Sequence, residues 1–196
     1  MSEQLEIEYK NLLSKEEYET LLEQFQISNI QINRQINHYF DTATFSLKDQ
    51  HTALRVREKS NNFEMTIKQP ASIGLLETNQ KLEKKEAQRF LQGGSIPEGV
   101  VKNKLSTLAI SVEDILYFGT LITDRVEIEY KGGILVFDHS HYLNMEDYEI
   151  EYEVIDPIMG EKIFTQLLAS FHIPIRKTEN KVHRFYQHKY QQSQEN

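Results

Sequence analysis

Several stretches of the chain alternate between hydrophobic and polar residues, which is the pattern of half-buried β-strands. In residues 4–10, Leu5, Ile7 and Tyr9 share one face, and mostly charged side chains occupy the other. Further β patterns cover residues 28–41, 52–59, 63–69, 117–131, 134–138 and 147–154, with a weaker one at 74–81. The Gly132-Gly133 pair predicts a hairpin between two of these strands. The pattern predicts an antiparallel sheet.

Two amphipathic helices are predicted around these strands. Ser14 and Glu17 have the spacing of a capping box, and an apolar stripe follows them. After the last strand, Asp156 is suited to be an N-cap and Pro157 to be the first helical residue. Each helix has one apolar side, which must be buried against the apolar side of the sheet.

The remaining segments contain no repeat and no flexible linker. Residues 82–116 suit helices better than strands, so they predict a short helical insertion. The tail from Lys177 is expected to be helical or extended and to fray over about residues 190–196. A length of 196 residues fits one core, and we expect a single domain over residues 1–196.

Composition narrows the class of protein. The chain has no cysteine, which excludes disulfide scaffolds and thiolate metal sites. The first thirty residues include several charged side chains and no apolar signal region, and no apolar run approaches 18 residues, so we expect a cytoplasmic protein without a membrane partner. A formal net charge of −8 disfavours nucleic acid as the main partner. The sequence does not indicate an oligomeric state.

The charged residues are concentrated on one side of at least five predicted strands. In the strand at 147–154, for example, Asp147, Glu149, Glu151 and Glu153 share one side. If the helices cover the apolar sides of a sheet that closes on itself, all charged sides point inward. The pattern therefore predicts a barrel with a polar, charged lumen and flanking amphipathic helices.

An acidic lumen has to be neutralised. Residues two apart on a strand are about 6.7 Å from each other, where two like charges repel by roughly 2.5 kcal/mol at an effective dielectric constant of 20. Basic residues at 53–59 and 64–68, together with Arg125, offset part of this repulsion. A metal–polyphosphate ligand meets both needs, because carboxylates hold Mg²⁺ or Mn²⁺ and lysine and arginine hold phosphoryl oxygens.

The motifs that carry a family resemblance follow one another along nearly the whole chain. The first is an ExExK signature, Glu6-Ile7-Glu8-Tyr9-Lys10. It is followed by RVR at 55–57, Lys68 in TIKQP, Arg125 in DRVEI, Asp138 in LVFD, EIEYE at 149–153, and Lys181 and Arg184 in NKVHRFY. With these motifs the chain resembles the CYTH superfamily, the triphosphate tunnel metalloenzymes. YFDT at 39–42 and GLLETNQ at 74–80 are similar to its small single-domain bacterial branch.

The resemblance implies an α+β fold with an eight-stranded antiparallel β-barrel, or tunnel, that acts on triphosphates with Mg²⁺ or Mn²⁺. The implied metal ligands are Glu6, Glu8, Asp138, Glu149, Glu151 and Glu153. The implied phosphate-binding residues are Lys10, Arg55, Arg57, Lys68, Arg125, Lys181 and Arg184. The implied catalytic group is Glu6, Glu8, Lys10 and Glu151, with Glu8 or Glu151 orienting a water molecule. Many relatives have two acidic residues where this chain has Glu77-Thr78-Asn79, so the role of Glu77 stays open.

Four functions compete on this basis. The leading hypothesis is a metal-dependent hydrolase of inorganic tripolyphosphate or of a small organic triphosphate such as thiamine triphosphate. A CYTH-type adenylate cyclase would use the same charges to align a ribose hydroxyl instead of water. A polyphosphate- or nucleotide-binding module would use them without catalysis, and an ordinary ligand-binding barrel would expose them to water.

One further motif lies outside this set. His139 and His141 are two residues apart and would share one face of a strand, as a zinc-binding pair does. The sequence shows no obvious third ligand, so we expect this pair to be an exposed strand edge.

Overall fold

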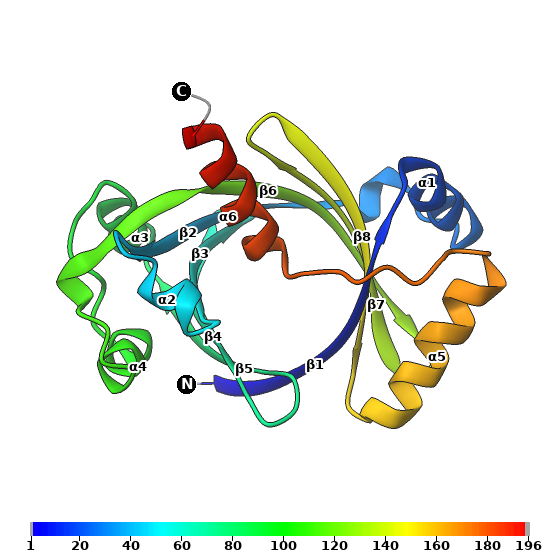
Figure 1. The fold of residues 1–196 in the computed structure, drawn as a ribbon, viewed down its shortest axis with the longest axis horizontal. Helices are drawn as coiled ribbons and strands as arrows, with labels where there is room; N and C mark the ends of the chain where they lie inside the picture. The colour runs from blue at the N-terminus through cyan, green and yellow to red at the C-terminus, as the bar shows by residue number, and fades with distance from the viewer. Residues whose placement is uncertain (1, 195–196) are drawn as a thin grey trace. The chain divides into compact units, whose positions relative to one another are not determined.

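The computed structural model describes residues 2–194, and the side chains of residues 3–190. Its strands are β1 (Ser2–Leu13), β2 (Asn33–Thr42), β3 (Ala53–Lys59), β4 (Asn62–Pro70), β5 (Leu75–Leu82), β6 (Ile115–Tyr130), β7 (Gly133–Tyr142) and β8 (Met145–Val154). They form a closed antiparallel barrel in the order β1-β5-β4-β3-β2-β6-β7-β8 (Figure 1). The eight-stranded antiparallel barrel expected from the family resemblance is therefore confirmed.

Helices connect and cover the strands. They are α1 (Lys15–Gln24), α2 (Ser46–Asp49), α3 (Lys84–Leu91), α4 (Val100–Thr107), α5 (Pro157–Ser170) and α6 (Lys181–Gln194), with short 3₁₀ turns η1 (Asn29–Gln31) and η2 (Val112–Asp114). Each described helix is too short or too polar to span a membrane. Helices α3 and α4 and the turn η2 lie between β5 and β6, in the segment for which the sequence predicts a helical insertion. Of the tail expected to fray, residues 195–196 lie outside the described residues.

The chain divides into two compact units, each with its own hydrophobic core. The first unit comprises Met1–Glu6 and Gln35–Leu121. Its core joins the apolar sides of β3 and β4, including Val56 and Ile67, to α3 and α4. Phe40 of β2 stacks on Phe90 of α3 with ring centroids 4.2 Å apart.

The second unit comprises Ile7–Arg34 and Ile122–Asn196. Its core joins the apolar sides of β7 and β8, including Phe137 and Ile150, to α1 and α5. The predicted caps are present. Ser14 and Glu17 form the capping box of α1, and the Asp156 side chain accepts from the Met159 N–H at the start of α5.

The position of these cores decides which side of the strands faces inward. In the first unit α3 and α4, and in the second unit α1 and α5, pack on the apolar side of the strands. Successive residues of a strand point to opposite sides, so the charged residues lie on the side away from these four helices. Since the barrel is closed, this side is the interior, and the predicted charged lumen follows.

Two elements were not expected from the sequence. The 3₁₀ turn η1 occupies the start of the β pattern predicted at 28–41, so that β2 begins only at Asn33. Helix α2 follows Phe45, which has a left-handed φ of 59°. The buried Asp41 carboxylate organises this turn, because it accepts from the backbone N–H groups of Leu47 and Lys48 at 2.9 and 3.2 Å. The N-cap residue Phe45 makes no side-chain hydrogen bond to the helix, so the Asp41 side chain takes over this role.

Candidate active site

The densest group of buried charges lies on the inner side of β6, β7 and β8 in the second unit. Arg125 and Asp138 are direct partners in the β6–β7 ladder. Arg125 donates from Nε and Nη2 to the two oxygens of Asp138, at 2.7 and 2.6 Å, and from Nη2 to Glu151 Oε2 at 2.8 Å. Asp138 is fully buried. These hydrogen bonds hold the Arg125 guanidinium between a carboxylate of β7 and a carboxylate of β8.

Helix α6 adds two more cations to the same group. Lys181 Nζ lies 2.8 Å from Asp138 Oδ2 and 2.5 Å from both Glu149 Oε1 and Glu151 Oε1. Arg184 lies 2.7 Å from Glu149 Oε2 through Nη1, and its Nε donates to Asp147 at 3.0 Å. Acidic residues recur at every second position of β8, and α6 begins at Lys181 beside them. Positive and negative side chains therefore lie next to one another in this group.

Burial and neighbouring charges set different pKa values in this group. Burial, with a contribution from Glu151, raises the pKa of Glu149 to about 7 although Lys181 and Arg184 oppose it. Burial also acts on Glu151, but Lys181 and Arg125 outweigh it and hold the pKa of Glu151 well below its usual range. Glu149 is therefore a carboxyl that can gain or lose a proton near neutral pH, while Glu151 stays ionised.

Two more carboxylates lie where β1 and β8 pair. Glu8 and Glu153 are direct partners in the ladder, and each offers an oxygen within 4.8 Å of the other. Lys10 forms an ion pair with Glu8 and donates to Asn180 Oδ1 at 2.8 Å. Burial alone would lower the pKa of Lys10, but Glu8 and Glu151 raise it, so Lys10 stays charged.

These carboxylates suit a hard divalent cation. Their donors are oxygen atoms only, which is the donor type that Mg²⁺ and Mn²⁺ prefer. Glu6 precedes Glu8 by two residues on β1 and belongs to the ExExK signature. The residues present therefore fit the metal that the sequence implies.

The first unit carries its own set of charges. Lys68 Nζ of β4 lies 2.6 Å from Glu6 Oε2 and also pairs with Glu77 of β5. Burial would raise the pKa of Glu77, but Lys68 and Arg55 outweigh it and lower this pKa to about 2. Arg57 donates from Nε to Asn37 at 2.9 Å. The buried Nε of Arg55 has no hydrogen-bond partner among the residues described, so it can serve a ligand.

The predicted site residues thus divide between the two units. The second unit brings together Glu8, Lys10, Arg125, Asp138, Glu149, Glu151, Glu153, Lys181 and Arg184. The first unit holds Glu6, Arg55, Arg57 and Lys68. Sequence reasoning missed Asp147, which pairs with Arg184, and Asn180, which accepts from Lys10. Asp147 continues the acidic alternation of β8 and could have been found from it, whereas Asn180 has no such signal.

The chain is similar to known proteins over almost its whole length. The CYTH domain family matches residues 4–186. YjbK of Bacillus subtilis (strain 168), provisionally named a triphosphatase, is 47% identical over 189 residues, which cover 96% of this chain and 98% of that protein.

Solved structures have the same fold. A Bacillus halodurans protein provisionally named an adenylate cyclase is 45% identical, with a TM-score of 0.92 over 95% of this chain and 100% of its own. A Hippeastrum protein, provisionally named an adenylyl cyclase and described as having a dominant triphosphatase activity, is 20% identical, with a TM-score of 0.75 over 95% of this chain and 96% of its own. The family match and the Bacillus relatives cover almost the whole chain, and the chain therefore belongs to the CYTH domain family.

Proposed function

We propose that this protein is a metal-dependent triphosphatase, acting on inorganic tripolyphosphate or on a small organic triphosphate such as thiamine triphosphate. The observation that carries the proposal is the buried group of Asp138, Glu149 and Glu151 with Arg125 and Lys181. Taking such charges out of water costs several kcal/mol per ion, and well-packed hydrophobic residues are often as stable in their place. The cost is explained if the charges serve a highly charged ligand.

The cations are suited to the phosphate groups. Arginine forks and lysine ammonium groups bind phosphoryl oxygens through charge-assisted hydrogen bonds. We assign this role to Lys10, Arg55, Arg57, Lys68, Arg125, Lys181 and Arg184. The name of YjbK, at 47% identity over nearly the whole chain, supports a triphosphate as the substrate.

The carboxylates are suited to a metal and to proton handling. Glu6, Glu8 and Glu153 are the proposed metal ligands, with Asp138, Glu149 and Glu151 as further members of the predicted set. When bound, Mg²⁺ or Mn²⁺ would neutralise charge on the phosphate oxygens.

Glu151, which stays ionised, is suited to orient the attacking water by accepting its hydrogen bond. Glu149, with a pKa of about 7, can hold or release a proton at neutral pH. Lys10 and the other cations position the phosphate chain and stabilise negative charge that develops in the transition state.

A phosphate-release panel tests this function. Tripolyphosphate, thiamine triphosphate, ATP and long-chain polyphosphate would each be incubated with Mg²⁺ and separately with Mn²⁺. We expect tripolyphosphate or thiamine triphosphate to be hydrolysed faster than ATP, with no activity in excess EDTA. Absence of metal-dependent phosphate release from every triphosphate would refute the proposal.

The same panel tests the adenylate cyclase alternative. The support for this alternative from the Bacillus halodurans relative is limited to the name of that protein. The site residues identified in the described part of the chain are assigned to phosphates and metal, and none of them is assigned to hold a ribose hydroxyl in line. Phosphorus NMR of the ATP reaction is therefore expected to show orthophosphate or pyrophosphate release with little cyclic AMP. Cyclic AMP as the dominant product would favour the cyclase.

The expected setting is the cytoplasm, with a small-molecule triphosphate as the partner and neither nucleic acid nor a membrane. A chain without cysteine and with a net charge of −8 is consistent with this setting. Subcellular fractionation with an antibody to the protein tests it.

A further inference from the structure

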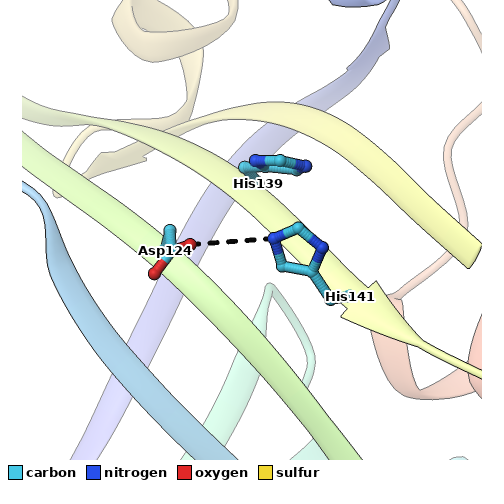
Figure 2. A group of neighbouring side chains, drawn as sticks. All are labelled: Asp124, His139 and His141. Atoms are coloured by element: carbon cyan, nitrogen blue, oxygen red, sulfur yellow. Dashed lines mark ion pairs between the residues drawn. The ribbon is translucent and has the colours of Figure 1, made fainter.

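A second group of metal-binding side chains lies on the other side of β6 and β7, away from Arg125 and Asp138. It consists of Asp124 of β6 and of His139 and His141 of β7 (Figure 2). One candidate ligand atom of each residue lies within 4.8 Å of the others. Asp124 and His139 are direct partners in the ladder, and His141 follows two residues later on the same side. The β-ladder therefore supplies the third ligand that the sequence did not show.

We propose that Asp124, His139 and His141 bind a divalent transition-metal ion such as Zn²⁺ or Co²⁺. Two imidazole nitrogens and one carboxylate oxygen suit these ions, whereas Mg²⁺ favours sites built from oxygen alone. Three protein ligands leave at least one position for water or another small ligand. This site is separate from the proposed triphosphate chemistry, because strand alternation turns its side chains away from Arg125 and Asp138.

Neighbouring groups already hold the ligands in place. The ring of His139 stacks on Tyr148 with centroids 4.3 Å apart and planes 18° apart. Its Nε2 is hydrogen bonded to Glu146 Oε2 at 2.9 Å. A metal-binding histidine usually gives its other ring nitrogen to a carboxylate in this way, which fixes the tautomer and the ring orientation. His139 would then bind the ion through Nδ1.

Asp124 is oriented in the same manner. Arg34 donates from Nε to Oδ1 at 2.8 Å and from Nη2 to Oδ2 at 2.7 Å. If the ion binds Oδ2, the Nε bond to Oδ1 can remain as the orienting contact, since each carboxylate oxygen accepts separately. Arg34 is 64% exposed, so its Nη2 can turn to solvent.

The spacing and exposure of the ligands allow an ion to enter. His141 Nε2 lies 3.7 Å from Asp124 Oδ2. Two donors that bind one ion at about 2.0–2.1 Å stand at most about 4.2 Å apart, so this pair already has a suitable separation. The side chains of Asp124, His139 and His141 are 19%, 24% and 38% exposed. Small side-chain rotations therefore suffice, and no buried contact has to open.

A Co²⁺ titration tests this site in the intact protein. The titration would be followed by visible absorption, which reports the ligands of Co²⁺, and it would contain saturating Mg²⁺ to occupy oxygen-only sites. We expect one equivalent of Co²⁺ to bind. His141→Ala and Asp124→Asn should each weaken binding by about 10-fold or more, and Glu146→Ala by about 10-fold, which is the usual cost of losing an orienting partner.

The matched control is His172→Asn. His172 is exposed and has a left-handed φ of 56°, which asparagine tolerates. This variant should bind Co²⁺ as the unmodified protein does. Equal losses in the control and in His141→Ala would overturn the proposal, as would the absence of Co²⁺ binding under saturating Mg²⁺.

A second measurement does not depend on any variant. In NMR spectra of the histidine ring nitrogens, added Zn²⁺ should shift the signals of His139 and His141 and leave that of His172 unchanged. If Zn²⁺ shifts neither of the two strand histidines, the site is a hydrogen-bonded surface cluster without a metal.

Discussion

Lys181 Nζ lies 2.5 Å from Glu149 Oε1, and the Glu149 side chain is fully buried. The two residues are 32 positions apart, on α6 and β8. Glu151 follows Glu149 on the same side of the strand and shares the Lys181 ammonium. The competition between this cation and the burial of two carboxylates decides which of the two glutamates is ionised at neutral pH.

The first prediction concerns the stability of the Glu149→Gln variant at different pH values. The pKa of Glu149 is about 7 in the folded protein, above its ordinary value of 4.5. Between these values the folded state holds a proton that the unfolded state has lost, so the contribution of Glu149 to stability falls as pH rises. Glutamine does not titrate. The free energy of unfolding of Glu149→Gln should therefore increase relative to that of the unmodified protein between pH 4.5 and 7, by at most about 3 kcal/mol.

Chemical denaturation at a series of pH values measures this difference. Glu151→Gln is the matched control on the same strand, because the pKa of Glu151 is lowered instead. Its carboxylate stabilises the fold above its ordinary pKa and loses this effect as pH falls. Glu151→Gln should consequently be less stable than the unmodified protein at pH 7, with a loss that shrinks in acid. Equal pH dependence of both variants would contradict the assignment.

A second prediction follows from removing the shared cation. Lys181→Met leaves Glu149 and Glu151 buried beside Asp138 with less countercharge. Breaking a buried ion pair in this way costs about 3–5 kcal/mol. We expect a lower free energy of unfolding at pH 8 and a smaller loss at pH 5, where Glu149 is protonated. The exposed Lys177, replaced in Lys177→Met, is the control and should change stability by less than about 0.5 kcal/mol.

The alternation of β8 shows how much the sequence could predict. Charged and apolar residues alternate along this strand, so the sequence predicts that Glu149 and Glu151 lie on the same side of it. The closed barrel and the helical insertion follow from the same patterns together with the family resemblance. The alternation shows which residues of a strand share a side, but not which residues of the neighbouring strand they meet.

Partners across the fold could not be predicted in this way. Asp124 meets His139 only because of the register between β6 and β7, and a shift of one residue would send it to the other side. Lys181 reaches Glu149 because α6 returns to the strands after a segment without regular structure. These contacts depend on three-dimensional placement, for which the local pattern carries no signal.

A third prediction concerns metal dependence. Glu8→Gln removes one carboxylate from the facing pair Glu8 and Glu153 and keeps nearly the same shape. The Mg²⁺ concentration needed for half-maximal triphosphatase activity should rise about 10-fold or more, because an amide oxygen binds the cation more weakly than a carboxylate. Glu98→Gln is the control, since the Glu98 side chain is 84% exposed and far from this ladder in sequence. An unchanged Mg²⁺ requirement in Glu8→Gln would exclude Glu8 as a ligand.

The last prediction concerns substrate binding by Lys68, which pairs with Glu6 and Glu77 and is 20% exposed. A charge-assisted hydrogen bond to a phosphate contributes about 1.5–3 kcal/mol, so Lys68→Ala should raise the KM for tripolyphosphate by roughly 10- to 100-fold. Lys84→Ala is the control, because Lys84 is an exposed lysine on α3. Lys68→Arg keeps the charge and should recover part of the affinity. If Lys84→Ala raises KM as much as Lys68→Ala, binding depends on overall charge and not on a defined phosphate site.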